Sequence, residues 1–460
     1  MTLSVVILAA GKGTRMRSAV PKVLHLLAGQ ALLDHVLTTA ASLSSNLIVV
    51  YGYEGDKICA HLEKAHPSYP KPKLIEQKNP AGTGHAVLQA LPLLKASQRV
   101  LILYGDVPLI NASTLQHFIT QIPANAMGVI TAKVPNPTGF GRILRDAQGQ
   151  FLGVVEEKDA TAAQRAINEI NSGILVAPAS LLKDYLPQVT NDNQQKEYYL
   201  PDIIPKVLAA GIPVMGLCLE SPDEILGIND RIQLAQAERY YQQQLAHELQ
   251  RAGVTICDPA RLDIRGTLHC EPDVTLDVNV IIEGHVSIGS GCHIGAHSIL
   301  RNTSLGNNVV VHPFSLIEGA TIDDQCTIGP YARIRPETTL AKNVKIGNFV
   351  EIKKATLGEA SKVNHLSYVG DAHIGRAVNI GAGTITCNYD GMNKHVTTID
   401  DHVFIGSNTA LVAPVTIGEG ATIGAGSVIT RDAPAQQLTL SRATQKTIGR
   451  WEREKKIEDN

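Results

Sequence analysis

The C-terminal half of the chain has an aliphatic residue at nearly every sixth position, and a small or polar residue usually follows it. The aliphatic positions are Leu276, Ile282, Ile288, Ile294, Leu300, Leu305, Val311, Ile317, Ile322, Ile328, Ile334, Leu340, Ile346, Ile352, Leu357, Val363, Val369, Ile374, Ile380, Ile399, Ile405, Leu411, Ile417, Ile423 and Ile429. A repeat of six is typical of a parallel β-helix, whereas an ordinary amphipathic strand alternates with a period of two. We therefore predict a solenoid whose recurring aliphatic side chains point inward, each contributing about 1.5–3 kcal/mol through burial.

The N-terminal half contains short, continuous apolar runs separated by turn-rich polar stretches. Residues 4–10 and 99–104 have the pattern of strands buried inside a parallel sheet, and further strands are expected at 46–51 and 73–77. Helical segments are expected over 82–94 and around 203–208. Because strands and helices alternate, we predict an α/β, Rossmann-like, doubly wound sheet.

Between the two halves, residues 230–252 lack proline and glycine and are rich in Gln, Ala and Leu. This composition predicts a long linker helix that Asp230 caps and Gly253 ends. The predicted organisation is an α/β domain at 1–229, a linker helix at 230–252 and a hexapeptide-repeat domain at 253–460.

Composition narrows the class of protein. With 460 residues, the chain is too long for one compact core. A net charge of -2 provides no general field that would attract nucleic acid or an anionic membrane. The 7 cysteines are scattered without paired spacing, which indicates a reducing compartment and no structural zinc. No signal peptide or apolar run of membrane-spanning length is visible, so we expect a cytoplasmic protein without membrane insertion.

Candidate chemistry in the first half lies where strands end. The run over 4–10 opens into Gly11-Lys12-Gly13-Thr14-Arg15, which matches neither the dinucleotide fingerprint nor the P-loop. Two glycines and nearby cations suit a nucleotide triphosphate, although many such turns only connect a strand to a helix. Asp106 follows the strand at 99–104, where open α/β sheets bind ligands. It can ligate Mg²⁺ or merely cap a turn.

In the solenoid, functional side chains interrupt the repeat. Arg335 and Lys353 fall at corners of successive coils, roughly 4.8 Å apart, where a phosphate could bind between them. His365 and Tyr368 lie close together, and an insertion over 384–394 could form a pocket. Three alternatives remain at this point: a solvated surface, a structural histidine, and a metal site in which His365, His373 and His395 converge between subunits.

The motifs LAAGKGTRM, YGDVP, GTGHA and EINSG, in this order, closely resemble those of the sugar-nucleotide pyrophosphorylases. Joined to a hexapeptide solenoid, the chain resembles the bifunctional N-acetylglucosamine-1-phosphate uridylyltransferase / glucosamine-1-phosphate N-acetyltransferases over nearly its whole length. The resemblance implies an enzyme that acetylates glucosamine 1-phosphate with acetyl-CoA and then transfers UMP from UTP to N-acetylglucosamine 1-phosphate. Its product, UDP-N-acetylglucosamine, is a precursor of peptidoglycan and lipopolysaccharide.

The resemblance also implies roles for residues of the first domain. Asp106 and Asn229 are expected to bind Mg²⁺, although Asn229 could simply cap the next helix. The residues expected around UTP and the UDP-sugar are Leu8, Ala9, Ala10, Gly11, Lys22, Gln77, Gly82, Thr83, Tyr104, Gly105, Asp106, Gly141, Glu156, Asn171 and Asn229. Among them, Lys22 should neutralise phosphate, and Gly141, Glu156 and Asn171 should hold the sugar.

For the second domain, the resemblance implies that His365 is the general base that deprotonates the attacking amine. The residues expected at glucosamine 1-phosphate are Arg335, Lys353, Tyr368 and Asn379. Those expected at coenzyme A are Ala382, Asn388, Tyr389, Ser407, Ala425 and Arg442, with Asn388 also reaching the sugar. The solenoid should associate as a homotrimer with an acetyl site between neighbouring subunits.

Two other classes of function compete with this interpretation: a pyrophosphorylase whose solenoid only oligomerises or regulates, and a non-enzymatic scaffold. The polar insertion and the complete set of N-terminal motifs argue against the scaffold. The charged tail after Arg450 is predicted to be a solvated helix.

Overall fold

The structure is a computed structural model that describes residues 2–64 and 68–450. The chain forms two compact units, Met1–Gln244 and Leu245–Asn460, and each is described by itself. The tail after Arg450, for which a helix is predicted, lies outside the described residues. No helix in the described part of the chain is both long and apolar enough to cross a bilayer.

The first unit is built on a nine-stranded sheet in the order β11-β7-β10-β6-β1-β4-β5, with the β8–β9 hairpin attached to β10. The strands are β1 Leu3–Ala9, β4 Leu47–Tyr51, β5 Lys73–Glu76, β6 Arg99–Tyr104, β7 Met127–Lys133, β8 Arg142–Arg145, β9 Phe151–Val155, β10 Glu169–Pro178 and β11 Val214–Leu219. β6, β1, β4 and β5 are parallel to one another, whereas β10 runs antiparallel to both β6 and β7. The sheet is therefore mixed.

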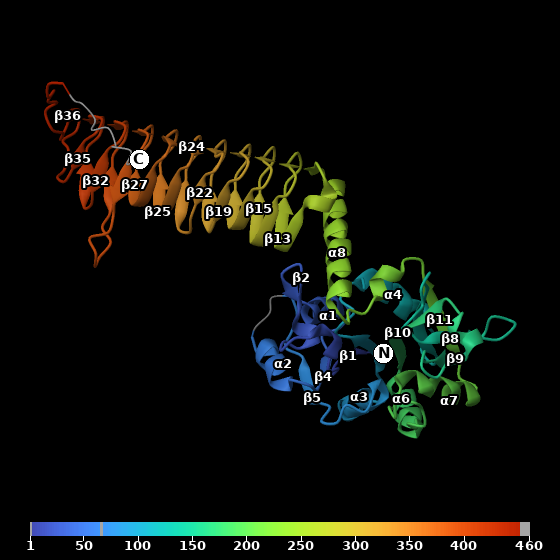
Figure 1. Cartoon of the computed structure of the whole chain (residues 1–460). Helices are drawn as coiled ribbons and strands as arrows, with labels where there is room; N and C mark the ends of the chain where they lie inside the picture. Colours follow the sequence, from blue (N-terminus) through green and yellow to red (C-terminus); the bar gives the residue numbers. More distant parts are fainter. Residues whose placement is uncertain (1, 65–67, 451–460) are drawn as a thin grey trace, which may run out of the picture. The chain divides into compact units, whose positions relative to one another are not determined.

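Successive residues of the central strands feed two separate cores, as expected for strands that are buried on both faces. Val5 and Ile7 pack with α1, α2 and α4, whereas Val6 and Leu8 pack with α3, α6 and α7. The helices are α1 Leu32–Ala41, α2 Gly55–Leu62, α3 Thr83–Ala90, α4 Ala112–Gln121, α5 Ala162–Arg165, α6 Ala179–Tyr185 and α7 Ile203–Ala209 (Figure 1). Helices thus cover both faces of the sheet, which confirms the α/β prediction.

The second unit is a left-handed parallel β-helix whose coils stack from β12 to β36 (Figure 1). One sheet consists of β12 Thr255–Ile256, β14 Thr275–Leu276, β16 His293–Ile294, β18 Val310–Val311, β21 Thr327–Ile328, β24 Lys345–Asn348, β26 Lys362–His365, β28 Asn379–Ile380, β31 Phe404–Ile405, β34 Thr422–Ile423 and β36 Leu438–Thr439. The other consists of β13 Asp263–Cys270, β15 Ile281–Ile288, β17 Ile299–Leu305, β19 Leu316–Glu318, β20 Ala320–Ile322, β22 Arg333–Ile334, β23 Thr338–Leu340, β25 Glu351–Leu357, β27 Tyr368–Ile374, β29 Ile385–Cys387, β30 Thr397–Ile399, β32 Ala410–Val412, β33 Val415–Ile417 and β35 Val428–Ile429.

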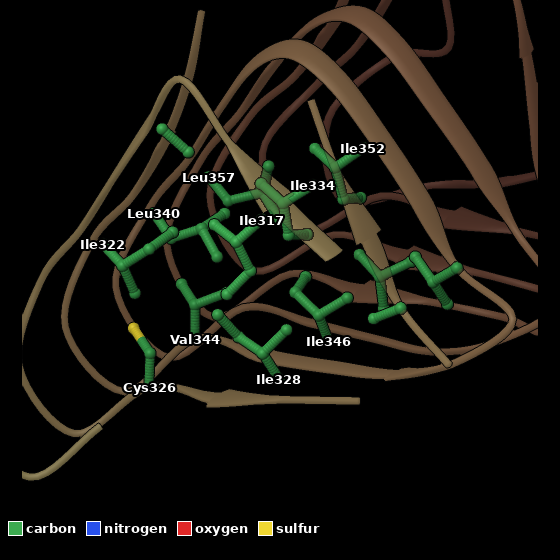
Figure 2. Packing of buried hydrophobic residues seen from close by; sticks show 14 of the residues in the cluster. Ile317, Ile322, Cys326, Ile328, Ile334, Leu340, Val344, Ile346, Ile352 and Leu357 are labelled. Carbon is green, nitrogen blue, oxygen red and sulfur yellow. The ribbon is translucent and has the colours of Figure 1, made fainter. Parts of the chain in front are cut away.

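Every aliphatic position of the predicted six-residue series is buried in one continuous core. Figure 2 shows this packing in the middle coils, where Ile328 and Ile346 lie in one layer and Ile334 and Ile352 in another. Each coil thus adds aliphatic side chains to files that run along the solenoid. The prediction of inward-pointing aliphatics is confirmed.

The insertion is shorter than the predicted 384–394. Thr386 is buried at the position where the series would place an aliphatic, and its strand β29 still pairs with β27 and β32. The chain leaves the coil only between β29 and β30, over residues 388–396. The buried Thr386 hydroxyl donates a hydrogen bond to the Gly370 carbonyl at 3.0 Å, so this inward position can hold a polar residue. The prediction followed aliphatic residues only and therefore missed this repeat.

The long helix α8, Arg231–Arg251, matches the predicted linker helix. Asp230 caps it by accepting hydrogen bonds from the backbone N–H groups of Ile232 and Gln233 at 3.0 and 2.9 Å. Within the first unit, Ala237 packs on Leu27 and Leu32.

Candidate functional site

A cavity of about 520 Å³ opens at the carboxyl ends of β1 and β6, a volume typical of small-molecule sites. Its lining includes ten of the residues that sequence analysis assigns to the nucleotide site. These are Leu8, Ala9, Ala10, Gly11, Lys22, Gln77, Gly82, Thr83, Tyr104 and Asp106. Gly105 lies directly beside them, because its N–H donates to the Leu8 carbonyl at 2.9 Å. The turn after β1 and the turn after β6 therefore form one site.

Glycine is required at two of the turns that shape this cavity. Gly13 has φ +57°, and a Cβ there would lie 2.7 Å from the Lys22 Cβ. Gly82 has φ +103°, and a Cβ there would lie 2.5 Å from the Tyr198 carbonyl oxygen. Left-handed backbone and close approach both exclude larger residues. The two glycines allow the chain to pack closely around the cavity without side chains that would fill it.

Lys22, Asp106 and Asn229 converge at one point of the site, although they come from distant parts of the sequence. The Lys22 ammonium forms an ion pair with Asp106 Oδ2 and donates a hydrogen bond to Asn229 Oδ1 at 3.1 Å. The Lys22 and Asp106 side chains are only 12% and 16% exposed. The two oxygens thus hold a single cation between them. A carboxylate and an amide oxygen are also suitable ligands for Mg²⁺.

Elsewhere in the lining, Gln77 is buried, and its side-chain amide donates to the Gly82 carbonyl at 3.0 Å and contacts His85 Nδ1 at 2.9 Å. Thr83 begins α3 and accepts a hydrogen bond from the Leu200 N–H at 3.0 Å. These contacts restrain the side chains of Gln77 and Thr83, and both residues line the cavity. Such fixed amide and hydroxyl groups suit recognition of a nucleobase.

Gly141, Glu156 and Asn171 form a second cluster, which Tyr104 joins to the cavity. The Asn171 N–H donates to the Gly141 carbonyl at 2.9 Å, and Glu156 Oε1 lies 3.1 Å from where a Gly141 Cβ would stand. The Tyr104 ring packs against Gly173, two residues from Asn171. Burial, with the nearby Asp202 and Asp159 carboxylates, raises the pKa of Glu156 to about 7. The expected sugar-binding residues are therefore neighbours.

Sequence analysis assigned no role to Glu197, whose side chain lines the cavity. The adjoining residues are fixed by backbone hydrogen bonds, in which Gly84 N–H donates to the Tyr198 carbonyl and Tyr198 N–H donates to Ala81, each at 2.8 Å. This segment is far from the strand ends in sequence. The signal that could have located it is the cluster of polar and aromatic residues just before α7.

In the second unit, His365 belongs to a file of residues that repeats at one corner of successive coils. Backbone hydrogen bonds define the file. The Leu366 N–H donates to the Asn348 backbone carbonyl at 3.1 Å, and the Gly383 N–H donates to the His365 backbone carbonyl at 3.3 Å. The Asn408 N–H donates to the Ala382 carbonyl at 2.6 Å, and the Gly426 N–H donates to the Ser407 backbone carbonyl at 2.8 Å. The file of consecutive corners is Asn348, His365, Ala382, Ser407 and Ala425. Arg442 then donates to the Ala425 carbonyl at 3.1 Å, so His365 and four of the predicted coenzyme A residues share one edge of the solenoid.

His365 is exposed, and its Nδ1 lies 2.9 Å from Asn348 Oδ1. A carboxamide oxygen only accepts hydrogen bonds, so this contact assigns the ring hydrogen to Nδ1. Nε2 is then the free, basic nitrogen. Asn348, which sequence analysis missed, therefore sets the tautomer of His365.

A ladder of alternating charges leads to the predicted phosphate site. It consists of Arg265, Glu283, Arg301 and Glu318, with contacts of 3.3 Å from Arg265 to Glu283 and 3.2 Å from Arg301 to Glu318. The alternation ends at Arg335 and Lys353, which follow the register partners Ile334 and Ile352 on successive coils. Two cations at adjacent coils attract an anion.

Further groups surround these two cations. Glu351 pairs with Arg335 at 2.8 Å, and Lys353 lowers the pKa of Lys394, a third cation that sequence analysis missed. Asn388 donates to Tyr368 Oη at 3.4 Å and to the buried carboxylate of Asp371. Thus Lys353, Tyr368 and Asn388 are held in one polar cluster at the base of the excursion over 388–396.

Two predicted residues lie at the margins of this arrangement. Asn379 begins β28, between Lys362 of β26 and Phe404 of β31, on the sheet that carries His365. Tyr389 is 61% exposed in the excursion, and its hydroxyl donates to the Gly391 carbonyl at 2.6 Å. Contact of Tyr389 with coenzyme A stays a prediction.

The histidines proposed for a metal site have separate partners: Asn348 for His365, Thr356 for His373 and Asp390 for His395. Across residues 2–64 and 68–450, no cluster of three or more His, Cys, Asp or Glu side chains could hold a metal ion.

Comparison with known proteins decides among the candidate classes. The MobA-like NTP transferase domain matches residues 5–169, the GMPPB C-terminal domain matches 316–397, and bacterial transferase hexapeptide repeats match 397–431. The hexapeptide repeat of succinyl-transferase matches 285–312. The "Bifunctional protein GlmU" of Alkalilimnicola ehrlichii is 51% identical over 452 residues, which cover 98% of this chain and 96% of that protein.

The chain belongs to the bifunctional GlmU family. The "Bifunctional protein GlmU" of a Janthinobacterium species is 49% identical over 99% of this chain and 100% of its own length. That of Ralstonia nicotianae is 50% identical over 98% of each chain. As a GlmU family member, the protein is a bifunctional enzyme of UDP-N-acetylglucosamine synthesis, with a nucleotidyltransferase and a hexapeptide acetyltransferase domain. The scaffold and the single-activity pyrophosphorylase are thereby excluded.

Proposed function

We propose that residues 253–460 acetylate glucosamine 1-phosphate with acetyl-CoA, and that residues 1–229 transfer UMP from UTP to the resulting N-acetylglucosamine 1-phosphate. Residues 230–252 would link the two domains. The order of reactions follows from this division, since the product of the second domain is the substrate of the first. The chain's seven free cysteines favour a reducing compartment, and we propose that both reactions occur in the cytoplasm.

The uridylyl reaction is supported by the convergence of Lys22, Asp106 and Asn229 beside the cavity. An oxygen of the sugar phosphate attacks the α-phosphorus of UTP, and pyrophosphate leaves. Lys12 and Lys22 line the cavity and neutralise phosphate charge, while Gln77 and Thr83 orient the base. Positioning and charge neutralisation supply most of the catalysis in such transfers.

Asp106 and Asn229 fit a magnesium ion, because their oxygens already converge on one cation, the Lys22 ammonium. When bound, Mg²⁺ would offset charge on the phosphate oxygens. The sugar would lie against Gly141, Glu156 and Asn171, where the carboxylate and amide accept and donate hydrogen bonds. Tyr104 would separate this subsite from the nucleotide.

The acetyl reaction is supported by the file that joins His365 to Ala382, Ser407 and Ala425. The amine of glucosamine 1-phosphate attacks the thioester carbonyl, and His365 Nε2 accepts the proton that the amine loses. The carbon–sulfur bond then breaks, and coenzyme A leaves as a thiol after taking up a proton. Arg335 and Lys353 would hold the sugar phosphate, with Tyr368, Asn379 and Asn388 on the sugar.

We also propose that the solenoid forms a homotrimer. Support comes from an exposed aromatic ladder in which His297, Phe314, Tyr331 and Phe349 stack with ring centroids 4.8, 5.1 and 5.4 Å apart. All four residues have positive φ, a conformation that costs a bulky residue roughly 1–2 kcal/mol. Burial between subunits would offset this cost.

Both half-reactions should be assayed on the purified protein. With glucosamine 1-phosphate, acetyl-CoA, UTP and Mg²⁺, we expect coenzyme A, pyrophosphate and UDP-N-acetylglucosamine in equal amounts. With N-acetylglucosamine 1-phosphate in place of glucosamine 1-phosphate, synthesis should not need acetyl-CoA. A requirement for acetyl-CoA with the acetylated sugar would contradict the proposed assignment of the two reactions to separate domains.

A further inference from the structure

The Lys22 ammonium occupies the point between the two oxygens proposed to bind the metal. It forms an ion pair with Asp106 Oδ2 and donates to Asn229 Oδ1 at 3.1 Å. The two oxygens come from the turn after β6 and from the residue before the cap of α8. The lysine reaches both from η2, Lys22–Leu24, in a largely buried position where its side chain is 12% exposed.

A divalent cation and this ammonium cannot occupy that point together. Mg²⁺ takes its oxygen ligands at about 2.0–2.1 Å, and the lysine nitrogen would then stand within a few ångströms of a doubly charged ion. Two cations at such a distance in a partly buried site repel strongly. Either Mg²⁺ does not bind at this point, or the Lys22 ammonium moves away from it.

The Lys22 ammonium has an alternative position in the same cavity. Lys22 lines the same cavity as Lys12 and the backbone of Gly11, where the triphosphate is proposed to lie. The base of its side chain lies close to Gly13, where an added Cβ would stand 2.7 Å from the Lys22 Cβ. Only the flexible end of the side chain needs to turn from the carboxylate toward the phosphates.

We propose that Lys22 is an internal counter-ion that competes with the divalent cation and that nucleotide binding removes this competition. The proposal rests on the metal site proposed above. In the free protein, Lys22 neutralises Asp106 and weakens metal binding. When phosphate groups draw the ammonium away, both oxygens are released to the metal. Nucleotide and metal therefore bind with positive coupling.

The test is a titration of the nucleotide-free, full-length protein with Mn²⁺, followed by calorimetry and by the electron paramagnetic resonance signal of free Mn²⁺. Lys22→Met should bind Mn²⁺ at least about tenfold more tightly than the wild type, because a competing positive charge is removed. Lys12→Met, which removes a cavity cation that does not hold Asp106, should change the affinity less than about twofold. Lys22→Arg keeps the charge and should remain near the wild type.

Asp106→Asn separates failure of this proposal from failure of the metal site. If Asp106→Asn abolishes Mn²⁺ binding but Lys22→Met binds no more tightly than the wild type, the competition is wrong and the metal site stands. If Asp106→Asn leaves Mn²⁺ binding unchanged, the metal site is wrong and the proposal fails with it.

A second readout needs no variant. Lysine acylation followed by peptide mass spectrometry should show Lys22 protected in the metal-free protein and more reactive once Mn²⁺ is added. Lys12 serves as the internal control and should show no change. Unchanged Lys22 reactivity at saturating Mn²⁺ would overturn the proposal even if Lys22→Met failed to fold.

Discussion

At the scale of single residues, Glu156 of the proposed sugar subsite also affects the stability of the first unit. Burial raises its pKa to about 7, so the folded protein holds this proton more tightly than the unfolded chain does. The folded state therefore binds more protons between pH about 4.5 and 7, and stability falls as the pH rises through that window.

Glu156→Gln, which cannot ionise, should be more stable than the wild type at pH 8 by about 1–2 kcal/mol and nearly equal to it at pH 5. Thermal unfolding of both proteins at the two pH values measures this. Glu157→Gln is the matched control, because the Gly139 N–H and Arg142 lower the pKa of Glu157 and its neutralisation should destabilise at pH 8. A Glu156→Gln variant that is less stable than the wild type at pH 8 would argue against a buried, proton-binding carboxyl.

His365→Ala should lower the rate of acetyl transfer about a hundredfold or more, the usual scale for loss of a general base, and leave uridylyl transfer unchanged. His373→Ala is the control, since His373 also lies exposed in the solenoid but bonds to Thr356. Release of coenzyme A, followed with a thiol reagent, measures the rate. Acetylation within a few-fold of the wild type would place the base elsewhere.

Several residues of the candidate sites could be located from the sequence because they follow strands directly. Asp106 comes just after β6, and Arg335 and Lys353 follow inward-pointing isoleucines. Glu197, Asn348 and Lys394 could not be found this way. Their importance comes from contacts across the fold, such as Asn348 with His365 and Lys394 with Lys353, and no local pattern encodes those contacts.

At the scale of elements, the solenoid depends on stacked aliphatic layers rather than on any one coil. Ile346 is 1% exposed on β24 and pairs in register with Ile328 and Val363. Ile346→Ala should leave a cavity and destabilise the second unit by about 2–5 kcal/mol. Chemical denaturation followed by circular dichroism and residual acetyl transfer measures the loss.

Lys345→Ala is the control for that substitution, because Lys345 is the preceding residue of the same strand and faces outward. It should change stability by less than about 0.5 kcal/mol. Equal effects of the two substitutions would contradict the inward and outward assignment.

The hydrophobic pattern predicted the elements well where one pattern, a continuous apolar run or the six-residue repeat, describes the whole segment. The strand expected at 99–104 coincides with β6, and the six-residue series located the core of every coil it covered. It did not predict β10, because the polar residues Asn171 and Ser172 interrupt the apolar positions of this strand. It also misplaced the start of the insertion at 384, since Thr386 continues the file with a polar residue.

At the scale of the whole molecule, the proposed trimer predicts that His365 and Arg442 of one acetyl site come from different chains. His365→Ala and Arg442→Ala should each abolish acetyl transfer alone. Unfolding the two variants together and refolding them as mixed trimers should restore roughly a quarter of the sites, given random mixing and one site per interface. No recovery in trimers shown to be mixed would mean that both residues act from one chain.

Asp106→Ala should separate the two activities, because we propose that the uridylyl and acetyl sites are independent. The variant receives glucosamine 1-phosphate, acetyl-CoA, UTP and Mg²⁺, and mass spectrometry follows both sugar products over time. We expect N-acetylglucosamine 1-phosphate to accumulate at the wild-type rate while UDP-N-acetylglucosamine falls by about a hundredfold or more, since only the first site loses a proposed metal ligand. UDP-N-acetylglucosamine formed at close to the wild-type rate, or acetylation lost together with uridylyl transfer, would contradict this expectation.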